Sequence, residues 1–369
     1  MKQAESGETR SLIERARDAE RRGDTATALG LYDDAIEELE REENLSSLAD
    51  ALRWKGTLHR EQGETEAAFR LYTESLHQAE KCGSVACKAH VYNCLAIVAQ
   101  RRGNVVESES LYQLAAEFAA RAGDVRLLGM IEQNRGVLLN MRGRLAAAEG
   151  RYYNSLGAFE QTNDGEAMSW VLNNLGMLYT KLGHYQRAVE TFDRALRIAR
   201  NRGDSLVDSV VTINLALVWV ALGKLDDAER ACAEAYGSAR SRGDHLTMAE
   251  ALKCRARIER ERGELKDSLA TLRIGIYEAE GLEDRLLQAE MLRELGETSR
   301  ALGNSADAEL AWREAAESFE DVGARSEAAE MKALLASIGS SATRQKPTNF
   351  RPKYIEPPTD FPQSPSAEL

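Results

Sequence analysis

The chain has no proline in its first 346 residues, although it is 369 residues long. Proline interrupts the interior of a helix because it lacks an amide hydrogen and its ring clashes with the preceding turn. A proline-free body therefore permits many consecutive helices. All six prolines come later, and their concentration predicts a disordered tail, which we place at residues 339–369. They are Pro347, Pro352, Pro357, Pro358, Pro362 and Pro365.

Cysteine and long apolar runs are also scarce. Five scattered cysteines do not make a disulfide framework. Cys87, His90 and Cys94 share one helix face, but zinc needs four ligands, so we expect neither a metal nor a cofactor. No apolar run approaches the ~20 residues that span a bilayer, and the N-terminus lacks a signal-peptide core. We therefore expect a cytoplasmic protein that is not inserted in a membrane.

Basic residues are fewer than acidic ones, and the formal net charge is −12. Binding to nucleic acid depends on neutralising phosphates with Lys and Arg, so we do not expect a nucleic-acid partner. Motifs of catalysis are absent too: we find no phosphate-binding glycine loop, metalloprotease pair or nucleophile elbow. The sequence therefore predicts a protein that is not an enzyme.

What the chain does have is a glycine every forty residues. A second, incomplete glycine series lies twenty residues out of phase, with Asn163, Glu43 and Glu283 filling its vacancies. The segments between these marks show the i, i+3, i+4, i+7 apolar spacing of amphipathic helices. Glycine just past a helix end adopts the left-handed conformation that closes the helix, and a following Asp caps the next one. The first series is 23, 63, 103, 143, 183, 223, 263 and 303, and the second is 83, 123, 203, 243 and 323.

Each forty-residue unit therefore predicts two helices joined by a tight turn, and its packing positions repeat as well. Small residues stand seven before the turn glycine and five and twelve after it, and a large residue stands nine after it in every unit except the sixth, which has Cys232 there. The small residues let helix axes approach closely, and we expect the large residue to fill the gap between pairs. In the fifth unit these positions and their neighbours are Leu175, Gly176, Tyr179, Gly183, Ala188, Phe192 and Ala195.

This order of small and large residues resembles the tetratricopeptide repeat. The unit is longer than the usual ~34 residues and lacks the usual terminal proline. In that respect it is similar to the repeats of kinesin light chains, of GoLoco-binding polarity proteins and of bacterial peptide-sensing regulators. The resemblance implies an all-α, right-handed superhelical solenoid of eight antiparallel helix pairs over residues 7–338. Residues 325–338 match a further first helix and predict a C-terminal cap.

In tetratricopeptide arrays the first helix of each pair lines the concave face, and the resemblance places recurrent amides there. Asn is a poor residue for a helix interior, so its repetition at nearly one position calls for a reason. A row of amides can hold the backbone of an extended peptide. The alternative is that these amides bond only to neighbouring helices. The candidates are Asn93, Gln133, Asn134, Asn173, Asn174 and Asn214.

Charged and apolar candidates lie at the same groove positions. Twelve basic and seven acidic side chains give the predicted groove a charge of +5, which favours an acidic or C-terminal-carboxylate peptide. The alternatives are ordinary solvated helix faces for the charges and solenoid core for the apolar residues. The candidates that we select are Arg53, Arg101, Lys181 and Arg257 among the basic residues, with Trp170 and Met177 among the apolar ones.

These observations predict an adaptor or scaffold that binds an extended segment of another protein in its concave groove. An alternative is a cytosolic sensor whose solenoid changes curvature when it binds a signalling peptide. The C-terminal tail is a third candidate partner, since Phe350, Tyr354 and Phe361 lie among its prolines and basic residues. It could dock on another protein, occupy the chain's own groove or act as a plain flexible tail.

Overall fold

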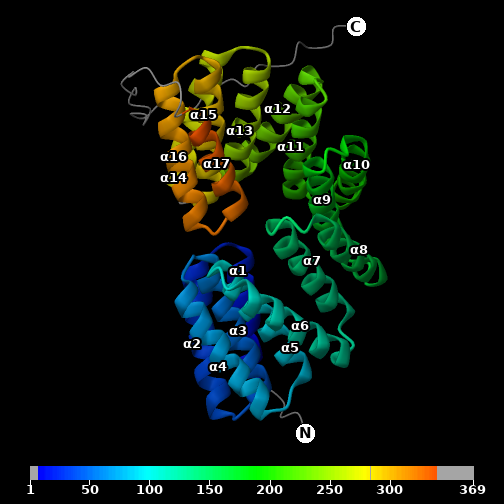
Figure 1. Cartoon of the computed structure of the whole chain (residues 1–369). Helices are drawn as coiled ribbons and strands as arrows, with labels where there is room; N and C mark the ends of the chain where they lie inside the picture. Colours follow the sequence, from blue (N-terminus) through cyan, green and yellow to red (C-terminus); the bar gives the residue numbers. More distant parts are fainter. Residues whose placement is uncertain (1–6, 283, 339–369) are drawn as a thin grey trace. The chain divides into compact units, whose positions relative to one another are not determined.

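The computed structural model describes residues 7–282 and 284–338, and in these ranges it contains seventeen α-helices and no strand (Figure 1). Eight consecutive helix pairs and one final helix confirm the all-α class and the number of repeats. The helices are α1 (Gly7–Arg21), α2 (Thr25–Arg41), α3 (Leu45–Glu61), α4 (Thr65–Lys81), α5 (Val85–Arg101), α6 (Val105–Ala122), α7 (Val125–Met141), α8 (Leu145–Gln161), α9 (Gly165–Lys181), α10 (Tyr185–Arg202), α11 (Ser205–Ala221), α12 (Leu225–Arg242), α13 (His245–Glu261), α14 (Leu265–Gly281), α15 (Arg285–Ala301), α16 (Ser305–Asp321) and α17 (Arg325–Ile338).

The turns lie where the glycine series predicts them. All thirteen glycines of the two series have a positive φ, which a residue with a side chain seldom adopts. Two of the predicted vacancies are also left-handed, Glu43 with φ 53° and Asn163 with φ 52°, while Glu283 lies outside the described residues. The Asp residues after the turns act as helix caps, as when the Asp124 carboxylate accepts a hydrogen bond from the Leu127 amide at 2.8 Å.

Glu43 is an exposed residue held in a conformation that suits glycine. We expect Glu43→Gly to raise the free energy of unfolding by about 0.5–1 kcal/mol, because the left-handed conformation costs a non-glycine residue about 1–2 kcal/mol. Urea denaturation measures this difference. The control is Glu40→Gly, at an exposed helical position of α2, which should instead lose about 1 kcal/mol. Equal losses in both variants would show that the turn does not favour glycine.

The large residue fills the gap between pairs, as expected, and it also packs against the small residue of the first helix in its own pair. Between pairs, the ring centroids of Tyr32 in α2 and Trp54 in α3 lie 6.3 Å apart, and the large residues of later units share core clusters with the helix that follows them. A Cβ built on Gly56 of α3 would stand 2.8 Å from the Tyr72 ring of α4. A Cβ built on Gly176 would stand 2.5 Å from the Phe192 ring, and a Cβ built on Gly296 would stand 2.4 Å from the Trp312 ring. The small position therefore admits a large buried ring, and this contact holds the two helices of a unit together.

The described residues form two compact units. Unit 1 contains residues 7–138 and 153–163, and unit 2 contains residues 139–152, 164–282 and 284–338. A single solenoid domain over 7–338 stays a prediction, and the predicted tail at 339–369 lies outside the described residues. None of the helices in the described ranges combines the length and apolarity needed to cross a membrane. The cytoplasmic localisation stays a prediction.

Candidate functional site

Unit 2 contains a pocket of about 920 Å³ along four first helices, α9, α11, α13 and α15. Each of these helices, labelled in Figure 1, contacts the next one in the series. The side chains that line the pocket come from all four of them. The second helices of the pairs contribute little to the lining, which includes Arg242 at the end of α12. We call this cavity the unit-2 pocket. It lies on the helices that the resemblance to tetratricopeptide arrays assigns to the concave face.

The half of the unit-2 pocket formed by α9 and α11 is apolar, with one pair of amides. Asn214 Nδ2 donates a hydrogen bond to Asn173 Oδ1 at 2.8 Å, across two first helices. Asn173 is buried, whereas Asn214 is half-buried and its Oδ1 accepts no hydrogen bond from the described residues. The pair therefore keeps hydrogen-bonding capacity at the pocket wall. The apolar side chains around it are Trp170, Met177, Val210, Ile213 and Leu217.

Unit 1 contains a matching pair of amides. Asn134 Nδ2 donates to Asn93 Oδ1 at 3.1 Å, again between residues 41 apart in the chain. The predicted row of amides thus consists of two cross-helix pairs, one in each unit. This bonding agrees with the alternative that the amides bond to neighbouring helices. Asn174 is half-buried and lies outside the pocket lining, and Gln133 is a half-buried neighbour of Asn134 in unit 1.

The other half of the unit-2 pocket, formed by α13 and α15, is charged. Lys253 pairs with Glu250, at 2.5 Å, and with Glu290. Burial alone would lower the pKa of Lys253, but the two carboxylates outweigh it and hold that pKa above its usual range. Burial would likewise raise the pKa of Glu290, and the Lys253 ammonium outweighs it and lowers that pKa. Lys253 therefore neutralises two carboxylates on adjacent first helices.

Two guanidinium groups in the same half are less completely paired. Arg257 lies 3.9 Å from Glu294, and its Nε is buried without a hydrogen-bond partner. Glu294 is bound more closely by Arg260, at 2.6 Å. Arg293 makes no ion pair within 4 Å with any described residue, but its charge contributes to lowering the pKa of Glu290. Arg257 and Arg293 therefore retain donors for a further acceptor.

The pocket lining does not carry the positive surplus predicted for the whole groove. Its four cationic residues are balanced by four acidic ones, so the formal sum is 4 − 4 = 0. The remaining basic candidates lie elsewhere: Arg53 binds Asp50 at 2.9 Å and Arg101 donates to the Arg60 carbonyl at 2.9 Å, both in unit 1. Lys181 is exposed at the end of α9, outside the lining. The structure thus brings Trp170, Asn173, Met177, Asn214 and Arg257 together at one site.

Sequence reasoning missed three leucines that border the unit-2 pocket. Leu206, Leu246 and Leu286 are the second residues of α11, α13 and α15, and their exposed fractions are 44%, 46% and 45%. We call them the leucine row. The signal was available, because Asp-x-Leu recurs at a spacing of forty residues in these units but not in the earlier ones. Our groove positions began four residues later in each helix and so excluded them.

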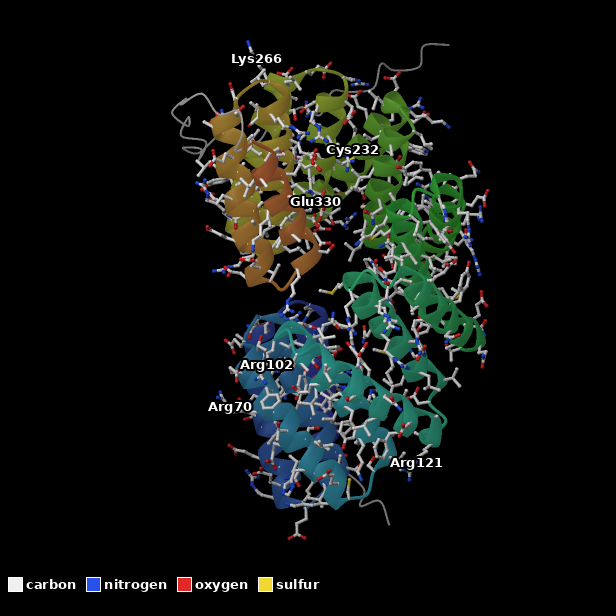
Figure 2. The ribbon with its side chains drawn as sticks, in the orientation of Figure 1. Arg70, Arg102, Arg121, Cys232, Lys266 and Glu330 are labelled. Atoms are coloured by element: carbon white, nitrogen blue, oxygen red, sulfur yellow. The ribbon has the colours of Figure 1, made fainter. Side chains whose placement is uncertain are left out.

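Three of the five cysteines, Cys87, Cys232 and Cys254, are buried. Cys232, labelled in Figure 2, is buried on α12 and donates from Sγ to the Ala251 carbonyl at 3.0 Å. Its hydrogen bond with Cys254, and then burial, raise its pKa well above the usual value, which keeps the thiol protonated. In the described residues, no three His, Cys, Asp or Glu side chains are grouped so that they could hold a metal ion.

The family comparisons match two parts of the chain. A model described as tetratricopeptide repeat matches residues 127–201. A model described as anaphase-promoting complex subunit 5 matches residues 208–262. No curated protein sequence matches the chain. The repeat match agrees with the forty-residue helix pairs of the structure.

Several solved structures share the fold. The apo form of the quorum sensor NprR from B. thuringiensis is 15% identical, with a TM-score of 0.66 over 84% of this chain and 87% of that one. A Rap protein complexed with competence and sporulation factor is 15% identical, with a TM-score of 0.59 over 91% and 98%. BtubC (BKLC) from P. vanneervenii is 24% identical, with a TM-score of 0.52 over 59% and 92%. At these identities the likeness concerns the fold alone.

Proposed function

Because the chain is a tetratricopeptide-type array of helix pairs, we propose that it is a protein-interaction scaffold that binds an extended segment of a partner in the unit-2 pocket. The observation that carries this proposal is the pocket itself, about 920 Å³ in volume and formed by four successive first helices. Pockets of ~300–1,000 Å³ hold small ligands, and this one is elongated across the repeats. Four helices at ~10 Å spacing span roughly 30 Å, or about nine residues of extended chain.

The chemistry of the lining supports a peptide as the ligand. The amide pair of Asn173 and Asn214 suits the N–H and C=O groups of an extended backbone, which have no partners within their own chain. The apolar side chains beside that pair suit apolar residues of the partner. Arg257 and Arg293 suit a carboxylate, so we retain an acidic segment as part of the proposal although the lining as a whole is neutral. No step of this binding role requires catalysis.

Peptide selection tests the proposal. The full chain is used to select binders from a phage-displayed library of random dodecapeptides, and the tightest are synthesised for fluorescence polarisation. Met177 lines the pocket and is 46% exposed, so Met177→Glu should weaken binding about a hundredfold by placing a charge among apolar groups. Leu222→Glu is the control, because Leu222 is 41% exposed in unit 2 and lies outside the lining.

A second comparison in the same assay isolates the amide pair. Asn214→Ala and Asn134→Ala remove the same kind of cross-helix hydrogen bond, but only Asn214 lines the unit-2 pocket. We expect about tenfold weaker binding for Asn214→Ala and unchanged binding for Asn134→Ala. A library that yields no binder, or binders indifferent to Met177→Glu, would contradict the proposal.

A sensor that changes curvature on binding is the second candidate. Two proteins with the same fold are a quorum sensor and a Rap protein in complex with competence and sporulation factor, which favours this alternative for a chain of similar length. The measurement is small-angle X-ray scattering with and without a selected peptide. A sensor would change its radius of gyration on binding, and a rigid scaffold would not.

A further inference from the structure

The last described helix, α17, continues the series of first helices in unit 2. It begins one period of forty residues after α15 and packs against α16 (Figure 1). Its last residue, Ile338, is therefore equivalent to Val218 of α11, three periods earlier. Met177 of α9 and Leu217 of α11 line the unit-2 pocket and stand one residue before that level of their helices. The described chain thus ends at the level of the apolar half of the pocket.

The length of chain that follows α17 is sufficient to reach that half. Phe350 is the first aromatic residue after Ile338 and comes twelve residues later. Packed first helices lie ~8–10 Å apart, so α17 is separated from α11 by about 24–30 Å and from α9 by about 32–40 Å. Twelve residues of extended chain, at ~3.3 Å each, cover about 40 Å. Phe350 can therefore reach the space between Leu217 and Met177.

The order of side chains along this stretch matches the order of surfaces along the pocket. A chain that leaves α17 first crosses α15 and α13, whose lining is mostly charged, and then reaches the apolar lining of α11 and α9. Residues 339–349 contain no aromatic residue and no Leu, Ile, Val or Met, and Phe350 follows them directly. Pro347 and Pro352, on either side of Phe350, disfavour a helix that would shorten the stretch. The polar stretch thus corresponds to the charged half, and Phe350 to the apolar half.

Charge and side-chain chemistry favour the same placement. Residues 344–353 include four basic residues and no acidic one, on a chain whose formal net charge is −12, so this segment is attracted to its own chain. The pocket lining from α9 and α11 has no charged side chain that a ring would leave unpaired. The Met177 thioether, which accepts a hydrogen bond from Asn173 Nδ2 at 3.7 Å, makes favourable contacts with aromatic rings.

We propose that the chain's own segment 344–353 docks in the unit-2 pocket, with the Phe350 ring between Met177 and Leu217. This inference rests on the proposed function for its consequence, which is that the segment competes with the partner for the pocket. A tether of about twelve residues gives an effective concentration of ~1 mM, so a segment with a Kd of ~0.1 mM weakens a competing ligand about tenfold. The partner therefore binds by displacing the segment.

Binding of the same segment in trans tests the docking. The probe is a fluorescein-labelled peptide of residues 342–356, measured by fluorescence polarisation against the full chain. Phe350→Ser in the chain should raise its affinity for this unaltered peptide about tenfold, because the chain's own segment no longer occupies the pocket. Phe361→Ser is the matched control in the same tail and should change the affinity less than about twofold. Equal affinities of the wild type and Phe350→Ser, or a larger effect of Phe361→Ser, would overturn the proposal.

A variant of the pocket then locates the contact. In the Phe350→Ser chain, the additional change Met177→Ser should weaken the peptide about tenfold, because the ring loses an apolar contact. Leu222→Ser is its control, since Leu222 is 41% exposed in the same unit and lies outside the lining. Circular dichroism verifies that both variants fold, and a peptide that itself carries Phe350→Ser should also bind at least about tenfold more weakly. A peptide that ignores both Met177→Ser and its own Phe350→Ser occupies another site, and the inference is then wrong.

The inference and the proposed function fail separately. If library peptides depend on Met177 but bind the wild type and the Phe350→Ser chain equally, the segment does not occupy the pocket, and the proposed function stands alone. If the peptide of residues 342–356 binds through Met177 while the random library yields no binder, the docking stands and the partner-binding role fails.

Discussion

Replacing Lys253 with methionine should lower the free energy of unfolding by about 2–3 kcal/mol at pH 7. Lys253 is 12% exposed and pairs with two carboxylates, Glu250 and Glu290, on adjacent first helices. Removing one partner of a buried ion pair costs ~3–5 kcal/mol, and the partial exposure of the two carboxylates reduces that figure. Urea denaturation followed by circular dichroism measures the loss.

The pH dependence of this loss follows from the pKa of Glu290, which Lys253 holds below its usual value. A depressed acid pKa contributes stability above the pKa of the unfolded chain, and that stability disappears as pH falls through the folded value. In Lys253→Met burial acts on Glu290 against Arg293 alone, so the pKa of Glu290 should rise. The difference between the two proteins should therefore be largest at neutral pH and shrink below about pH 4.

The control keeps the size of the side chains and removes all three charges. Lys253→Met combined with Glu250→Gln and Glu290→Gln should recover most of the stability at pH 7, because no carboxylate is left without its cation. If the single variant is as stable as the wild type, or if its loss is the same at pH 4 and pH 7, Lys253 does not hold α13 and α15 together by charge.

The second large effect is expected for Gly296→Ala, at about 2–3 kcal/mol of lost stability. The new Cβ would stand 2.4 Å from the ring of Trp312, which is fully buried. Because the ring cannot move without disturbing its neighbours, overpacking outweighs the gain in helix propensity of ~1 kcal/mol. Urea denaturation followed by tryptophan fluorescence measures the change.

Gly237→Ala is the matched control for this effect. Gly237 lies in α12 of the same unit, and a Cβ there would meet no atom within 4 Å. Only the helix propensity then changes, so the variant should gain about 0.5–1 kcal/mol. If both variants change the free energy of unfolding in the same direction, the small residue at position 296 is not needed to make room for the Trp312 ring.

Most of the fold could be predicted from the sequence because the marks of the repeat are local. A turn glycine is favoured by the φ of that one residue, and an N-cap Asp bonds only to the next few residues. Both can therefore be predicted from the local sequence. The partner of a large residue such as Phe192 is not local. Its ring meets Gly176 of its own pair, a contact that the spacing alone did not predict.

The candidate site was only partly predictable for the same reason. Periodicity placed Asn173 and Asn214 on the first helices, but their hydrogen bond depends on which helices are neighbours. The neutral balance of the pocket depends on which charged side chains line it, and the sequence alone did not show that acidic residues such as Glu290 line it together with basic ones such as Lys253. The leucine row could have been found from the sequence. It was missed because the positions assigned to the groove were taken from the resemblance to tetratricopeptide repeats, and those positions begin later in each helix.

The most direct test of the binding role is a crystal structure of the full chain with the tightest selected peptide. We expect the peptide to lie extended across α9, α11, α13 and α15, with its backbone bonded to Asn214 and its side chains against the lining of the unit-2 pocket. A peptide bound on the second helices of the pairs, or anywhere outside the unit-2 pocket, would contradict that role.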